Sequence, residues 1–177
     1  RCRSATVSVT SRGRSQYRAV PSWVSVGDMG AEPANGAVNA VAEFMVMLGD
    51  HERSLNEWDR WFADEFVRED RRQLIATPTG DAATFQQQHL AWFEMGLEDL
   101  NFEMTGVVAV FGDRLALTRS RIGYSSGFPV EMLSISQWTE EIDRLQRIVQ
   151  FDADDVDVAL QELDRLRLTL EADEGAR

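Results

Sequence analysis

The sequence contains one cysteine, two histidines and no lysine among its 177 residues. Because Cys2 has no second cysteine to pair with, the chain can form neither an internal disulfide framework nor a cysteine-based metal site. Apolar runs stay well below the roughly 18 residues that a membrane-spanning helix needs, and the first residues lack the apolar segment of a signal peptide. We therefore expect a cytoplasmic protein that binds neither a metal nor a cofactor.

Positive charge is scarce and unevenly distributed. The formal net charge is -12, and all 18 basic residues are arginines. Residues 1–36 carry five of these arginines against two acids, so the remainder of the chain is even more acidic than the total indicates. An acidic globular surface repels phosphate backbones, so we expect no nucleic-acid partner. The lack of a long apolar run predicts no membrane partner.

A chain of this length is expected to form one domain with tails. Residues 1–36 are rich in Arg, Ser, Gly and Val, a composition typical of a disordered linker arm. The alternative is an arm that docks on another domain. We place the domain at residues 37–170 and a disordered tail at residues 171–177.

The centre of the chain holds strand-like runs separated by short turns, at residues 100–111, 114–123, 128–138 and 144–151. The Gly112-Asp113 pair suits a two-residue hairpin loop, because glycine tolerates positive φ and aspartate bonds its own backbone. That loop sets the register, with Val110 opposite Leu115 and Gly106 opposite Arg119. We expect these runs to form an antiparallel sheet.

Apolar residues recur at helical spacing on both sides of this sheet and predict helices over residues 38–52, 81–96 and 156–170. Ser54, with Glu57 three residues later, suits the N-cap of a further helix. The order of elements predicts an α+β fold: a curved antiparallel sheet packed on three N-terminal helices, with a C-terminal helix.

A first strand is predicted over residues 65–74, with five consecutive charged residues at its centre. Side chains alternate along a strand, so Glu69 and Arg71 share one face, and the other carries Phe66 and the residues Arg68, Asp70 and Arg72. A solvated sheet edge is one interpretation. The other is that one set turns inward.

Arg119 falls on an otherwise apolar face of the predicted sheet. A guanidinium is not buried without a partner, so either this end of the sheet is exposed, or an acid or a ligand meets Arg119 in a cavity. Glu131 is the nearest acid on the next strand, although a simple loop would place it on the opposite face.

His89 lies four residues from both Phe85 and Phe93, which places it on the apolar face of its predicted helix. It is either a core histidine with one satisfied nitrogen or a general base at the floor of a pocket. His51 lies at a helix end and is expected to be exposed, so the two histidines form no metal site.

Several of these segments resemble one known family. They are Glu69-Asp70-Arg71-Arg72, the hairpin Gly112-Asp113-Arg114-Leu115-Ala116-Leu117 with Arg119, the ending Phe151-Asp152-Ala153-Asp154-Asp155, and the later Ala159 and Glu162-Leu163-Asp164. Over residues 38–167 the chain resembles the nuclear transport factor 2-like superfamily in its SnoaL-like branch. One departure is Asp143, which follows Ile142 where the family usually has glycine in the turn before the last strand.

The resemblance implies a cone-shaped fold with a pocket at its wide end, and often a homodimer through the sheet. It does not imply one reaction. We therefore hold two hypotheses. The first is a small-molecule-binding or dimerisation and sensing domain, such as an accessory domain of a larger protein. The alternative is a cofactor-independent isomerase, cyclase or hydrolase acting on a small hydrophobic carbonyl or epoxide-like substrate.

Under the enzyme hypothesis, apolar walls raise the pKa of a carboxylate base, and His89 or Arg119 stabilises a developing oxyanion. The candidate catalytic residues are Asp70, His89 and Asp152. The candidate pocket residues are Trp61, Phe66, Arg71, Phe93, Arg119, Glu131 and Gln150. The aromatic members have a second interpretation as ordinary core.

Overall fold

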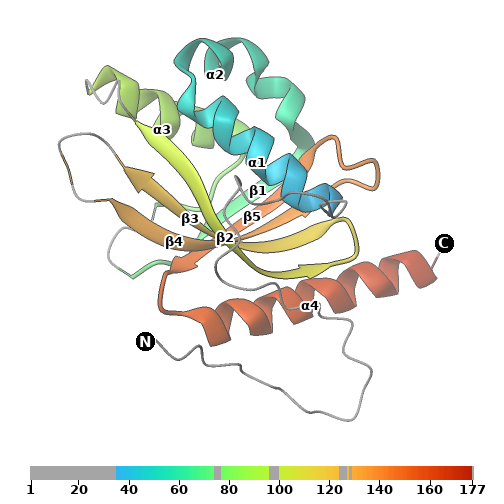
Figure 1. The fold of residues 1–177 in the computed structure, drawn as a ribbon. Coiled ribbons are helices and arrows are strands. Elements are labelled where there is room, and N and C mark those ends of the chain that lie inside the picture. The colour runs from blue at the N-terminus through green and yellow to red at the C-terminus, as the bar shows by residue number, and fades with distance from the viewer. Residues whose placement is uncertain (1–34, 74–76, 96–99, 124–126, 128, 177) are drawn as a thin grey trace.

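The computed structural model describes residues 35–73, 77–95, 100–123, 127 and 129–176. Three helices lie on one face of a curved sheet and the fourth crosses the other face (Figure 1). The helices are α1 (Gly36–Gly49), α2 (His51–Glu57), α3 (Ala82–Glu94) and α4 (Val156–Gly175). No helix in this part of the chain is long and apolar enough to cross a membrane.

The sheet has five strands in the order β1-β5-β4-β3-β2. They span Phe62–Asp70 (β1), Asn101–Phe111 (β2), Leu115–Gly123 (β3), Val130–Trp138 (β4) and Leu145–Asp152 (β5). The α+β prediction is confirmed, but the sheet is mixed, because β1 pairs with β5 in parallel. No tight turn joins β1 to β5, so nothing local imposes the antiparallel direction there.

Bulges in β2 modify the predicted hairpin register. Gly106 does lie opposite Arg119, as expected. Val110 pairs with Ala116 rather than Leu115, because the connection has three residues, Gly112 to Arg114, and not the predicted two. The register shift between Val107 and Ala109 then restores the predicted pair of Gly106 and Arg119. A bulge bends its strand and increases the local twist, which contributes to the curvature of the sheet.

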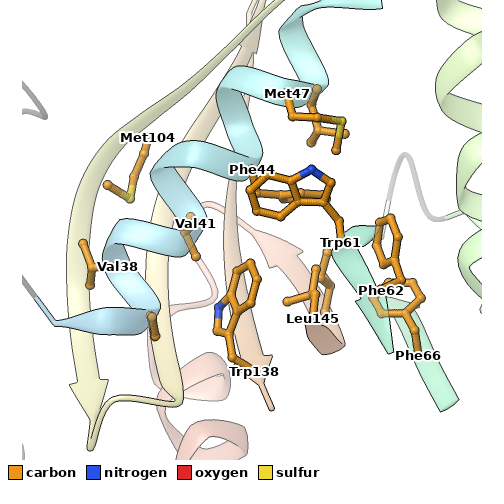
Figure 2. Packing of buried hydrophobic residues seen from close by; sticks show 14 of the residues in the cluster. Val38, Val41, Phe44, Met47, Trp61, Phe62, Phe66, Met104, Trp138 and Leu145 are labelled. Carbon is orange, nitrogen blue, oxygen red and sulfur yellow. The ribbon is translucent and has the colours of Figure 1, made fainter. Parts of the chain in front are cut away.

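The inner face of the sheet carries the larger core (Figure 2). Phe44 of α1 packs on Trp61 and Phe62, with ring centroids 5.7 Å away in both cases. Trp61 closes a short 3-10 turn, Trp58–Trp61, that leads directly into β1. Its side chain is buried, so the core interpretation of this aromatic segment is confirmed, although Leu55 of the same segment is exposed.

The outer face is covered over its central strands by α4. Ala159, Leu163, Leu166 and Leu170 belong to one buried cluster with residues of β2 to β5. The helix continues to Gly175, beyond the predicted domain end at residue 170. Of the arm predicted over residues 1–36, only Asn35 and Gly36 lie within the described residues, where they start α1.

Asp50, not Ser54, caps α2. The Asp50 carboxylate accepts a hydrogen bond from the Arg53 backbone N–H at 3.0 Å. Ser54 lies within α2 rather than before it and is buried in the core, where its hydroxyl donates to the Met47 carbonyl at 2.8 Å. Ser54 was therefore a wrong choice of cap, because a tertiary contact already uses its hydroxyl.

The turn before β5 is closed by side chains. The Thr139 hydroxyl donates to the Asp143 carboxylate at 2.6 Å and accepts from the Arg144 backbone N–H at 3.2 Å. The positive φ of this turn, 60°, falls on Ile142. Asp143 therefore holds the turn by a hydrogen bond, without the glycine found in the resembling family.

Candidate functional site

The charged run of β1 alternates between two environments. Arg68 pairs with Ile148 and Asp70 with Gln150 in the parallel ladder, and their side chains lie on the inner face. Glu69 and Arg71 point outward, where Arg71 pairs with Glu69 at 2.8 Å. The prediction that one set turns inward is confirmed.

Arg68 is the most enclosed cation of the site, with 3% of its surface exposed. Its Nε donates to Gln150 Oε1 at 2.9 Å, and its Nη1 donates to the Gln88 side chain on α3. The guanidinium carbon lies 4.6 Å from the centre of the Phe85 ring. Burial lowers the Arg68 pKa to about 10, so the side chain stays charged at neutral pH.

Asp70 is held by its neighbours as an ionised acceptor. Arg72 donates to both carboxylate oxygens, at 2.8 and 2.6 Å, and Thr77 donates through its backbone and its hydroxyl. Burial alone would raise the Asp70 pKa, but these hydrogen bonds outweigh it and lower the pKa to about 2. The expected upward shift is therefore wrong for Asp70.

The Arg68 charge is only partly balanced. The same Asp70 oxygen that Arg72 binds at 2.6 Å lies 3.5 Å from Arg68 Nη2. The contacts from Gln88 and Gln150 are to neutral amide oxygens. An anionic or strongly accepting atom beside Arg68 would therefore gain a charge-assisted hydrogen bond in a poorly solvated place.

A cavity of about 40 Å³ lies between α1, α3 and the inner face of the sheet. That is space for about three water molecules. The helices supply hydrophobic walls: Val41, Phe44, Met45, Leu48, Phe85 and Trp92. The sheet side supplies Phe102, Ile122, Met132 and Ile148 and all of the polar lining: Arg68, Arg72, Ser120, Ser134, Ser136 and Gln150.

One predicted pocket residue, Gln150, lines this cavity. Trp61, Phe66 and Phe93 are buried in the aromatic core and do not line it. Asp152 ends β5, and its carboxylate accepts from the Gln73 backbone N–H at 2.9 Å. The aromatic residues therefore stabilise the fold around the cavity but do not form the cavity wall.

Three predicted pocket residues lie on the outer face. Arg119 pairs with Leu133 and belongs to the apolar face that α4 partly covers. Its predicted apolar surroundings are confirmed, but it lies on the outer face of the sheet and not in the pocket. Glu131 lies on this face as well, opposite Arg121, contrary to the simple-loop expectation. Arg71 also points outward, to Glu162 at 3.2 Å.

His89 is fully buried in the core and does not line the cavity. Its Nε2 lies 3.1 Å from the Ser54 hydroxyl, and its ring packs among Trp58, Phe93 and Phe102. Burial lowers the His89 pKa to about 4, partly offset by the Leu48 backbone. This environment fits the core interpretation with one satisfied ring nitrogen.

The sequence analysis missed the hydroxyl-bearing lining of β3 and β4. Ser134 and Ser136 alternate with Leu133 and Ile135, and Ser120 follows the same period on β3. Polar residues at alternate positions of two neighbouring strands are a signal for one polar face. In this chain that face is the inner one, while the outer face takes the aliphatic residues.

No protein-family model matches the sequence, and neither does any curated protein. Among solved structures, PrhC from Penicillium brasilianum has a TM-score of 0.50 at 17% identity, covering 76% of this chain and 90% of its own. Bal32a, from a soil-derived mobile gene cassette, also has a TM-score of 0.50, with 14% identity over 68% of this chain and 92% of its own. A de novo designed protein with a curved β-sheet has the same TM-score at 10% identity, covering 76% of this chain and 99% of its own.

The chain has the nuclear transport factor 2-like fold. The fold that the resemblance implied is thereby confirmed, and the SnoaL-like branch stays a prediction. In this nuclear transport factor 2-like domain, the cavity lies between the helices and the concave side of the sheet. At these identities the likeness concerns the fold alone, so the function is argued from the chain's own residues.

Proposed function

We propose that the domain binds a small, mainly hydrophobic molecule that carries one anionic or strongly accepting oxygen, and that it does so without turnover. The observation that carries this proposal is Arg68, a buried guanidinium beside the cavity whose charge Asp70 balances only in part. Burying a guanidinium costs free energy unless it is paired, so a ligand oxygen here would recover part of that cost.

The rest of the lining suits such a ligand. A few placed polar groups among hydrophobic walls are typical of small-molecule sites. A ligand of more than a few atoms would have to move side chains at the cavity wall. Met45 and Met132 are suited to this, because unbranched thioether side chains adapt their shape at low cost.

A catalytic function has less support from the same residues. General base catalysis near neutral pH works best with a pKa close to that pH. The Asp70 pKa is about 2, and the His89 side chain does not contact the cavity. Binding without turnover therefore requires fewer assumptions than an isomerase, cyclase or hydrolase activity.

The test compares hexanoate with hexanamide, its neutral isostere, by isothermal titration calorimetry. We expect the wild type to prefer hexanoate by about 10-fold or more, since a hydrogen bond to a charged group is worth roughly 1.5–3 kcal/mol. Arg68→Met removes the charge and should abolish the preference. Arg71→Met, three residues further along the chain and on the outer face, should keep it.

A second variant guards against a folding defect. Arg68→Lys keeps the charge but loses the planar fork, so it should retain a weakened preference for hexanoate. Circular dichroism and urea unfolding establish that each variant is folded. Equal binding of hexanoate and hexanamide by the wild type, or an undiminished preference in folded Arg68→Met, would rule out the proposal.

A further inference from the structure

Ser120 is a buried hydroxyl that the fold leaves without a partner. It lines the cavity with 1% of its surface exposed, and its Oγ makes no hydrogen bond within the described part of the chain. A buried polar group left unpaired costs about 1–3 kcal/mol. An apolar residue would fit this position better if packing were its only role.

A hydroxyl nearby on the same strand behaves differently. Thr118 lies two residues before Ser120 on the same face of β3, and its hydroxyl donates to the Ser134 carbonyl at 3.4 Å. On the same face of β3, the Thr118 hydroxyl therefore has a hydrogen-bond partner, whereas the Ser120 hydroxyl, two residues later, has none within the described residues. The difference is that Ser120 borders the cavity and Thr118 does not.

Ser120 lies at some distance from the cation. Arg68 is bonded to Gln150 on β5, and one strand, β4, separates β5 from Ser120 on β3. Two strand spacings amount to roughly 10 Å across the sheet. On the sheet between them lie Met132 and Ser134 of β4, and the wall that α1 and α3 form opposite the sheet is hydrophobic.

We infer that the ligand has two polar ends, and that Ser120 binds the second one. This rests on the proposed function, which places an anionic or accepting oxygen at Arg68. The hydrophobic helical wall and the separation point to a medium-chain carboxylate with a hydroxyl or carbonyl at its far end. Ser120 is then the residue that distinguishes such an acid from a plain fatty acid.

The experiment measures the affinity of ω-hydroxy carboxylates of six to ten carbons, each against the carboxylate in which a methyl group replaces the hydroxyl. We expect the wild type to prefer one of the hydroxy acids by about 3- to 10-fold, the usual net value of a neutral hydrogen bond. Ser120→Ala should lose this preference and bind the hydroxy and methyl acids with equal affinity. Thr118→Val, which removes the satisfied hydroxyl, should keep it.

Unfolding of the ligand-free protein gives a second readout. Because the Ser120 hydroxyl has no partner, Ser120→Ala should leave the thermal midpoint unchanged or raise it. A lower midpoint would show a structural role for this hydroxyl and overturn the inference. So would an equal affinity of the wild type for hydroxy and methyl acids.

The two proposals fail differently. If plain carboxylates bind in an Arg68-dependent manner but no hydroxy acid is preferred, only the role of Ser120 is refuted. If no carboxylate is preferred over its amide, the proposed function fails and the inference fails with it.

Discussion

At the scale of single residues, two adjacent acids of β1 contribute very different amounts to the stability of the fold. Asp70 is enclosed and bonds two buried guanidiniums, whereas its neighbour Glu69 bonds Arg71 and Arg147 at the surface. Removing one partner from a buried ion pair leaves an uncompensated charge. Exposed pairs are worth less than about 1 kcal/mol, because solvent screens them.

We therefore predict that Asp70→Asn lowers the free energy of unfolding by about 3 kcal/mol or more. Glu69→Gln, on the same strand and of the same type, should lower it by less than about 1 kcal/mol. Urea unfolding monitored by tryptophan fluorescence measures both. Equal effects of the two substitutions would contradict the separation of inner and outer charges.

At the scale of elements, α3 is fitted closely to β1 through Gly80. The backbone of Gly80 exchanges two hydrogen bonds with Arg68, at 2.8 and 3.1 Å. A Cβ on Gly80 would lie 2.8 Å from Cβ and Cγ2 of Thr84, in the first turn of α3. Gln88, which bonds Arg68, lies one turn further along the same helix.

Gly80→Ala should therefore destabilise the fold by about 1–3 kcal/mol, since a packed backbone and a branched side chain must shift. Gly175→Ala, at the end of α4 with nothing within 4 Å, is the matched control and should be neutral or slightly stabilising. Thermal unfolding compares the two variants. A Gly80→Ala midpoint equal to that of the wild type would show that Thr84 yields without cost.

The boundaries of some strands could be predicted from the sequence and those of others could not. The strands β2 to β5 were predicted to within a few residues, because alternation and the Gly112-Asp113 loop are local signals. The first strand was predicted at residues 65–74 but begins at Phe62, directly after the Trp58–Trp61 turn. The aromatic spacing there resembled a longer helix, and tertiary packing decided otherwise.

The site was harder to predict for a related reason. Alternation in β1 grouped Arg68 with Asp70 correctly, but pairing with β5, a partner far along the chain, decides which group faces inward. Arg119 stood out because it interrupts an apolar face, yet that face is the one α4 covers. Local patterns identify faces, and only long-range contacts identify the concave one.

At the scale of the whole molecule, α4 bears on assembly. Dimerisation through the sheet stays a prediction. Leu163 and Leu166 of α4 are buried in one cluster with Leu117 of β3 and Leu133 of β4 on the outer face. A second copy would have to use the outer surface beyond this helix, near Arg119 and its neighbours.

Stability should depend on pH in a defined way. The His89 pKa falls from 6.5 to about 4 on folding. The unfolded chain therefore binds the proton more readily between these values. The contribution of neutral His89 to the free energy of unfolding is fully present above pH 6.5. It falls by about 3 kcal/mol as the pH drops towards 4. Asp70, with a folded pKa of about 2, adds a loss only below pH 4.

Unfolding midpoints in urea at pH 7, 5.5 and 4.5 measure this dependence. His89→Gln should flatten the profile between pH 6.5 and 4. His51→Gln, at an exposed position whose charge makes the smallest contribution to the lowered His89 pKa, should retain most of the wild-type slope. A wild-type profile that is flat across this range would show that His89 is not buried in its neutral form.

The division of the cavity lining between strands and helices has a consequence for how specificity can change. The charged and hydrogen-bonding side chains of the lining lie on the sheet side, whereas α1 and α3 contribute only hydrophobic side chains. Substitutions at Met45 or Leu48 could thus enlarge or narrow the cavity without altering the polar contacts around Arg68. If the domain binds a ligand as proposed, evolution or a protein engineer could change ligand length and ligand chemistry by separate sets of substitutions.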